Sequence, residues 1–225
     1  MDIKKNLLWM IQAGITEFST DAPSVVVPKD DTPTTILANS EALQATNLDE
    51  LNAKKAHFTE CPLYKTASHT LCGKGIPFAK LMCIVTCPNA DSDKSGISFS
   101  GDSGSLLSRM LKAIHLDMET QTYCTYLSPW RAPGNRKLTD SEIATLKPFL
   151  DQEIKLVQPQ LILLFGSELS SALLSVNTLS KARHTWHSYL DIPTRVSLPL
   201  DTINTTARRQ QAWEDLQEVQ KKLNQ

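Results

Sequence analysis

The chain has 225 residues, 41% of them hydrophobic and 21% charged, which is typical of a globular protein with a sizeable core. Its 23 lysines and arginines nearly balance 24 aspartates and glutamates, so any contact with nucleic acid must come from local patches. No stretch approaches the roughly 20 apolar residues of a membrane span. We therefore expect a cytoplasmic protein with no membrane contact.

The N-terminal part reads as an appendage. Residues 4–15, "KKNLLWMIQAGI", place apolar side chains at helical spacing, and residues 21–36 contain three prolines and few helix formers. The spacing predicts a helix followed by a linker over residues 1–45, and a main domain over residues 46–225. A second helix is expected at 47–58, where Asn47 and Glu50 form a capping-box pattern.

The main domain alternates apolar strands with amphipathic helices. Strands are expected at 81–87, 122–128, 160–166 and 194–200, and the longer helices at 103–116, 139–157 and 206–223. This alternation predicts an α/β fold, a three-layer α/β/α sandwich around a mostly parallel four-stranded sheet. Ligands bind such sheets at the carboxyl ends of the strands, so the loops 86–102, 128–138, 166–168 and 197–205 are the candidate site.

The five cysteines are expected to be free thiols, because their number is odd and no C-x-x-C motif is present. They are Cys61, Cys72, Cys83, Cys87 and Cys124. Neither these cysteines nor the five histidines have the ligand spacing of a metal site, and none is predicted.

Four segments of the main domain form a recognisable series. They are "DSDKSGISFSGDSGSLLSRMLKAIHL" (91–116), "YLSPWRAPGNRKLTDSEIATLKPFL" (126–150), "QPQLILLFG" (158–166) and "ARHTWHSYLDIP" (182–193). In both order and spacing they resemble the uracil-DNA glycosylases of family 4. The segments "PWRAPGNR" and "SFSGDSGSLL" are the most specific, and the likeness covers essentially the whole chain. The resemblance implies a fold that extrudes uracil from DNA and hydrolyses its glycosidic bond with water.

The resemblance also implies that three active positions have changed. The family's water-positioning carboxylate falls on Thr86, the asparagine that reads the uracil edge falls on Tyr126, and the histidine that stabilises the departing anion falls on Leu198. A phenol lacks the paired donor and acceptor of a carboxamide. Losing a donor aimed at developing charge typically costs about 10²–10³ in rate, and losing a positioned acid–base group about 10²–10⁴.

Other pocket positions are kept or left open by the resemblance. Phe99 matches the ring on which the family stacks uracil, and the rest of the expected base pocket comes from the end of the first main strand and from Tyr126. These residues are Cys87, Pro88, Asn89, Phe99 and Tyr126. Asp93 also matches the family pattern, and the sequence leaves open whether Asp91, Asp93 or Asp102 activates water in place of Thr86.

The family's iron–sulfur cluster is expected to be absent. Its four cysteine positions fall on Phe58, Cys61, Trp130 and Leu146, so only one thiolate remains where a cluster needs four.

Part of a DNA-facing edge is retained. The loop "RAPGNR" brings arginines and a Pro-Gly turn together, which suits a phosphate, and a second loop carries further basic residues near the family's minor-groove contact. The candidate DNA-binding residues are Arg131, Asn135, Arg136, Lys181, Arg183 and His184. A solvated turn without a ligand remains the alternative interpretation of these residues.

Three functions are compatible with these observations. The first is a weak or retargeted DNA glycosylase acting on uracil or another damaged base. The second, which the changed pocket favours, is a catalytically degenerate relative that binds DNA or a protein of replication or repair. The segment "LLWMIQAGITEFS" is similar to the opening helix of the psi subunit of the replicative clamp loader, which shares this fold and does no chemistry. The third is a structural remnant without a ligand.

Overall fold

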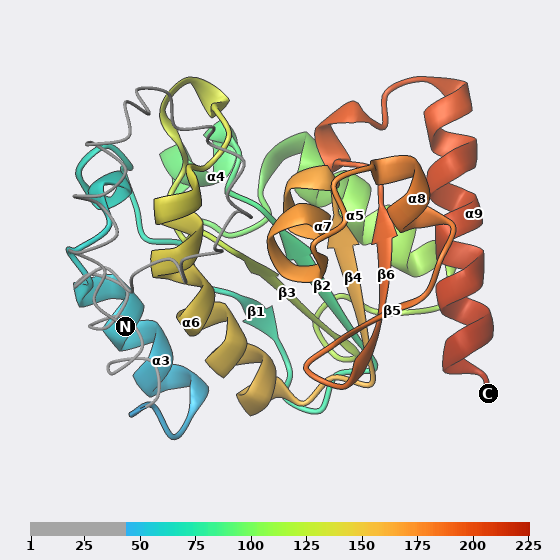
Figure 1. Ribbon diagram of the computed structural model, residues 1–225, viewed down its shortest axis with the longest axis horizontal. Helices are drawn as coiled ribbons and strands as arrows, with labels where there is room; N and C mark the ends of the chain where they lie inside the picture. The colour runs from blue at the N-terminus through green and yellow to red at the C-terminus, as the bar shows by residue number, and fades with distance from the viewer. Residues whose placement is uncertain (1–43) are drawn as a thin grey trace, which may run out of the picture. The chain divides into compact units, whose positions relative to one another are not determined.

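The structure, a computed structural model, describes residues 44–225 (Figure 1). The helix and linker predicted within residues 1–45, with the psi-like segment, lie almost entirely outside this range. The described chain forms seven α-helices: α3 (Leu48–His57), α4 (Ala90–Ser95), α5 (Gly101–Ala113), α6 (Asp140–Val157), α7 (Ser167–Leu174), α8 (Leu179–Arg183) and α9 (Thr206–Leu223). It also forms six strands: β1 (Lys74–Gly75), β2 (Leu81–Val85), β3 (Thr122–Tyr126), β4 (Leu161–Phe165), β5 (His187–Tyr189) and β6 (Ile192–Ser197).

All six strands join one mixed sheet in the order β1-β3-β2-β4-β6-β5. The four predicted strands form its parallel centre, because β2 pairs in parallel with β3 and β4, and β4 with β6. β1 and β5 add antiparallel edges, so the mixed α/β class is confirmed but the sheet has six strands and not four. The two edge strands have only two and three residues, too few to show an alternating pattern in the sequence.

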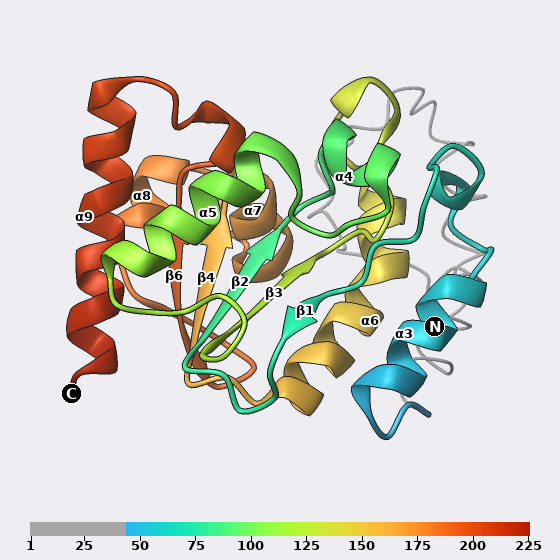
Figure 2. The same ribbon diagram turned by 180° about the vertical axis from the view of Figure 1, so that it is seen from behind.

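Helices cover both faces of the sheet. In β2, Met82 and Ile84 belong to one apolar cluster and Leu81 and Cys83 to another, as the alternation of side chains along a strand requires. The first cluster contains side chains of α3, α6, α7 and α8, and the second contains side chains of α5 and α9. Figure 1 shows α6 and α7 in front of the strands, and Figure 2, from behind, shows α5 crossing them.

A buried ionic network attaches α3 to the sheet. Lys55 and Glu153 have 4% and 0% of their side chains exposed, and the Lys55 ammonium lies 2.7 Å from the Glu153 carboxylate. The hydroxyls of Tyr123 and Thr125 on β3 donate to the same carboxylate, each at 2.9 Å. Glu153 is thus fully supplied with donors, as a buried charge must be.

The parallel strands place the loops predicted to hold the site at one edge of the sheet. After β2 the chain crosses to the face covered by α5, whereas after β4 it enters α7 on the opposite face. Two neighbouring strands whose connections diverge in this way leave a crevice between them, the usual place for a ligand. None of the helices formed by residues 44–225 combines the length and the apolar character that crossing a membrane requires.

Candidate functional site

A pocket of about 350 Å³ lies at the carboxyl ends of β2, β4 and β6. All four loops predicted from the sequence contribute to its lining, together with Tyr126 at the end of β3. The lining residues that bear on its chemistry are Thr86, Cys87, Pro88, Asn89, Phe99, Ser103, Tyr126, Arg131, Asn135, Arg136, Lys137, Ser167, Glu168, Asp201 and Thr202. The five predicted base-pocket positions therefore lie together in one cavity.

Tyr126 occupies one face of Phe99. The two rings are parallel within 8°, with their centroids 4.4 Å apart, and Tyr126 is only 4% exposed. The backbone N–H of Phe99 donates to the Tyr126 hydroxyl at 2.8 Å. Burial raises the pKa of Tyr126 to about 12, so the phenol remains neutral at physiological pH. The Tyr126 ring covers this face of Phe99, so no other planar group can stack there.

The Phe99 loop is held in a strained conformation. Phe99 has a φ of 58°, in the left-handed region that bulky residues rarely adopt. Gly104 permits the close packing of this loop on α5, because a Cβ atom at Gly104 would lie 1.6 Å from the Phe99 carbonyl oxygen. Asn89 caps α4 by accepting from the Ser92 N–H, and its amide donates to the Ser100 carbonyl. The oxygen and the nitrogen of the Asn89 amide are thus both hydrogen-bonded to backbone groups of this loop region.

The positions at which the sequence predicted a replaced catalytic group bring little chemistry to the pocket. Thr86 lines it, but Leu198 is buried in the apolar cluster with α5 and α9 and does not. Asp93 is 8% exposed and lies outside the lining, where its carboxylate accepts from the N–H of Ser68 at 2.8 Å. Asp91 and Asp102, the other carboxylates considered from the sequence, do not line the pocket either.

The loop 131–137 forms one wall of the pocket and exposes backbone. Gly134 and Asn135 both have positive φ, 63° and 56°, and a Cβ atom at Gly134 would meet no atom within 4 Å. Arg131 donates through Nε to the Asn135 side-chain oxygen at 2.9 Å, a contact that does not use its two terminal nitrogens. Both terminal nitrogens of Arg136 are instead taken by Glu142, at 2.8 and 2.6 Å.

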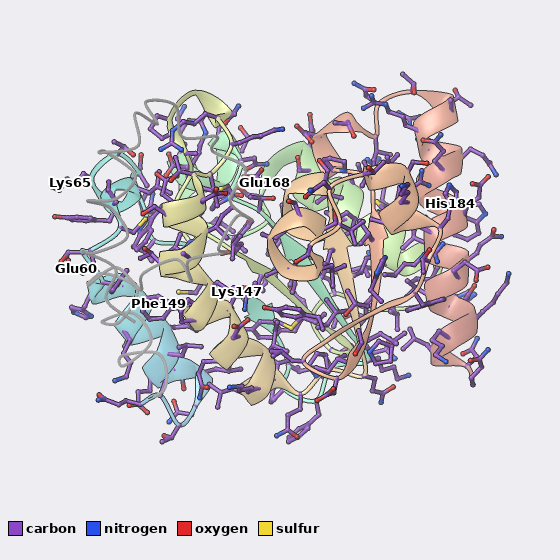
Figure 3. The ribbon with its side chains drawn as sticks, viewed as in Figure 1. Glu60, Lys65, Lys147, Phe149, Glu168 and His184 are labelled. Atoms are coloured by element: carbon purple, nitrogen blue, oxygen red, sulfur yellow. The ribbon has the colours of Figure 1, made fainter. Side chains whose placement is uncertain are left out.

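Two carboxylates in the pocket were missed by the sequence analysis. Glu168, labelled in Figure 3, stands in the first turn of α7, and Asp201 follows β6. Burial raises the pKa of Glu168, while the N–H of Leu138 stabilises its anion at 2.7 Å. Burial, with the nearby Glu168, also raises the pKa of Cys87 to about 12. Acidic residues are common in the first turn of a helix, so the position of Glu168 in the sequence did not mark it as a site residue.

The second loop predicted to contact DNA has both exposed and buried basic residues. Lys181 and His184 are exposed, and Figure 3 shows His184 on the side of α9, away from Glu168. Arg183 is 5% exposed, and its Nε lies 2.8 Å from the Asp215 carboxylate. Arg183 is therefore not available for the DNA contact predicted for it.

Comparison with known proteins decides the family. The model of the uracil DNA glycosylase superfamily matches residues 72–217, well over half of the chain. The chain belongs to the uracil-DNA glycosylase superfamily. The match includes every element from β2 to β6 and therefore the whole pocket.

Curated relatives of this superfamily member are type-4 uracil-DNA glycosylases. It is 29% identical to the Sulfurisphaera tokodaii protein over 53% of this chain and 54% of that one. It is 28% identical to the Saccharolobus solfataricus protein over 64% of this chain and 70% of that one. It is 29% identical to the Archaeoglobus fulgidus protein over 53% of this chain and 60% of that one. The match thus spans little more than half the length of the first of these relatives.

The four positions on which the resemblance places the family's iron–sulfur ligands lie in one apolar cluster. Phe58, Cys61, Trp130 and Leu146 are all at most 3% exposed, and the rings of Phe58 and Phe149 pack edge to face at 4.9 Å. Burial raises the pKa of the thiol of Cys61, the one cysteine among the four residues. A single buried thiol does not fit a cluster held by four thiolates.

Proposed function

We propose that this protein is a catalytically degenerate member of the superfamily that binds DNA without excising a base. The observation that carries the proposal is the stack of Tyr126 on Phe99, which fills the position where a base would lie. The membership in a family of repair enzymes and the exposed loop 131–137 support DNA as the ligand. In this proposal the protein works within DNA repair and the iron–sulfur cluster has been replaced by apolar packing.

An excision assay tests the loss of catalysis. Single- and double-stranded DNA containing uracil is incubated with the purified full chain, and abasic sites are then cleaved with alkali. We expect no product above the buffer control, while the *S. tokodaii* enzyme cleaves the same substrates. Product formed by the chain at a rate comparable to that enzyme would refute the proposal.

Fluorescence anisotropy with labelled DNA tests the binding. We expect an affinity that falls with salt, since phosphate contacts release counterions. Arg131→Ala should weaken binding to all sequences alike and lower the salt slope by about 1. Lys112→Ala, which removes an exposed charge at the far end of α5, is the matched control and should change neither. Undetectable or salt-insensitive binding contradicts the proposal.

Glu168 supports a second candidate function, a retargeted glycosylase. Its carboxylate lines the pocket, and burial raises its pKa toward the range of a general base. In this alternative Glu168 activates the water that Thr86 cannot position. Excision of any damaged base by the wild type, together with its loss in Glu168→Gln, would establish this function in place of the first.

A further inference from the structure

A second polar cluster lies between β6 and α9, outside the pocket. Arg183 at the end of α8 and Arg195 on β6 are 5% and 6% exposed, and both face the carboxylate of Asp215 on α9. Figure 1 shows α8 and α9 beside β6, and none of these three residues lines the pocket. Two buried cations thus share one buried anion, which leaves positive charge in excess.

The two arginines are unequally paired with this carboxylate. Arg183 donates through Nε to Asp215 at 2.8 Å and through Nη2 to the carbonyl of Gln211 at 2.8 Å, and the Ser197 hydroxyl also donates to Asp215. The Nη2 of Arg195 lies 3.9 Å from Asp215, beyond hydrogen-bond distance. The Nε of Arg195 is buried and has no hydrogen-bond partner within residues 44–225. Arg195 is therefore a buried cation that lacks an acceptor.

The surroundings of Arg195 add an aromatic ring and further positive charge. The guanidinium carbon lies 5.7 Å from the centre of the Trp186 ring, which is partly exposed. Lys181 and His184, close to Trp186 in the chain, are exposed. Glu218, whose charge also interacts with Arg195, lies 2.7 Å from Lys221 and is shared with that ammonium. The cluster thus has donors and positive charge beyond what its own carboxylates satisfy.

We propose that this cluster binds one oxyanionic group, a phosphate or a carboxylate, through the guanidinium of Arg195. Such a group supplies the acceptor that Nε lacks and neutralises the excess charge. The planar fork of a guanidinium fits two oxygens of a phosphate or a carboxylate, which an ammonium at this position would not. No bond is made or broken in this binding. The inference does not depend on the proposed binding of DNA.

The stability of an Arg195 variant distinguishes this role from that of a structural ion pair. If Arg195 served only to neutralise Asp215, its removal would lower the Tm strongly, because a buried charge would lose its partner. Asp215 keeps Arg183 and Ser197, however, and an apolar side chain in place of an incompletely paired buried charge is often neutral or stabilising. We therefore expect Arg195→Leu to keep or raise the Tm in a buffer that contains only chloride. A strong decrease overturns the proposal.

Thermal unfolding of the full chain in added anions tests the binding. Sodium phosphate and sodium acetate are each titrated at about pH 7 against sodium chloride of the same ionic strength. We expect one of the two oxyanions to raise the Tm of wild type by about 5–10 °C at roughly one hundred times its Kd. The larger response identifies the group as phosphate or carboxylate. No response beyond that to chloride overturns the proposal.

Matched variants locate the bound anion. Arg195→Leu should lose the response, and so should Arg195→Gln, which serves if the leucine variant does not fold. Arg209→Leu makes the same change at an exposed position of α9 and should respond like wild type. An equal response in wild type and in the Arg195 variants shows a general effect of the salt and overturns the proposal. A response that is lost in Arg131→Ala but kept in Arg195→Leu places the anion in the pocket and also overturns it.

The fluorescence of Trp186 supplies a second measurement at the same site. Anion binding next to its ring should change the tryptophan emission of wild type, with the same midpoint as the change in stability. Trp186→Phe should remove most of this change while keeping the shift in Tm. An emission change that persists unaltered in Trp186→Phe arises elsewhere in the protein and counts against the site.

Discussion

The substitution Lys55→Met isolates the contribution of the buried network that attaches α3. It removes the ammonium 2.7 Å from Glu153 and leaves a fully buried carboxylate with only the hydroxyls of Tyr123 and Thr125 as donors. Breaking a buried ion pair by removing one partner costs about 3–5 kcal/mol. For a domain of this size each kcal/mol lowers the Tm by about 2–4 °C, so we expect a decrease of about 6–20 °C.

Urea denaturation of wild type and variants measures the free energy of unfolding directly. Lys54→Met is the matched control, because Lys54 is partly exposed and lies 3.6 Å from Glu50, a surface pair worth at most about 1 kcal/mol. Adding Glu153→Gln to Lys55→Met should recover part of the loss, since the uncompensated charge is removed. A loss below about 1 kcal/mol for Lys55→Met, equal to that of the control, would refute the view of Glu153 as a charge dependent on its cation.

Three further predictions concern the pocket. Tyr126→Phe keeps the ring but leaves the backbone N–H of Phe99 without its acceptor, which should cost about 1–3 kcal/mol by calorimetry; an unchanged stability would show that water replaces the hydroxyl. Because the pKa of Glu168 is raised in the folded state, the wild type is most stable when this carboxyl is protonated, and its stability falls as pH rises through that pKa. The Tm of Glu168→Gln minus that of wild type should therefore grow between pH 4.5 and pH 8. A constant difference contradicts the raised pKa. Cys87, with a pKa of about 12, should react with iodoacetamide at pH 8 on the order of 10³ times more slowly than an unfolded thiol, as peptide mass spectrometry would measure; equal rates in native and urea-unfolded protein would contradict this.

The parallel centre of the sheet was predictable because its strands are long apolar runs. β2 and β4 each have five residues with almost every side chain buried, which gives a signal that the sequence carries locally. β1 and β5 were missed, since two or three residues at a sheet edge form a strand only through pairing with a distant neighbour. The sequence therefore identified the strands that define the ligand edge and missed those that border the sheet.

The candidate site was predictable in position but not in arrangement. The loops at the carboxyl ends of the strands do line one pocket, as the topology requires. The stack of Tyr126 on Phe99 depends on how the end of β3 meets the segment between α4 and α5, and the two residues are 27 positions apart in sequence. The burial of Arg183 depends on Asp215, 32 positions away on α9, and a basic residue with such a distant partner reads as a surface charge in the sequence.

Tyr126 has two structural roles, one for its ring and one for its hydroxyl, and together they couple the end of β3 to the Phe99 loop. The same side chain covers the face of Phe99 and supplies the acceptor for the N–H of a left-handed residue. A shorter residue at position 126 would uncover the ring and at the same time remove the acceptor from the strained loop. Neighbouring substitutions of this kind are not independent. Opening this face of Phe99 without a loss of stability therefore requires changes in the loop and in the strand together.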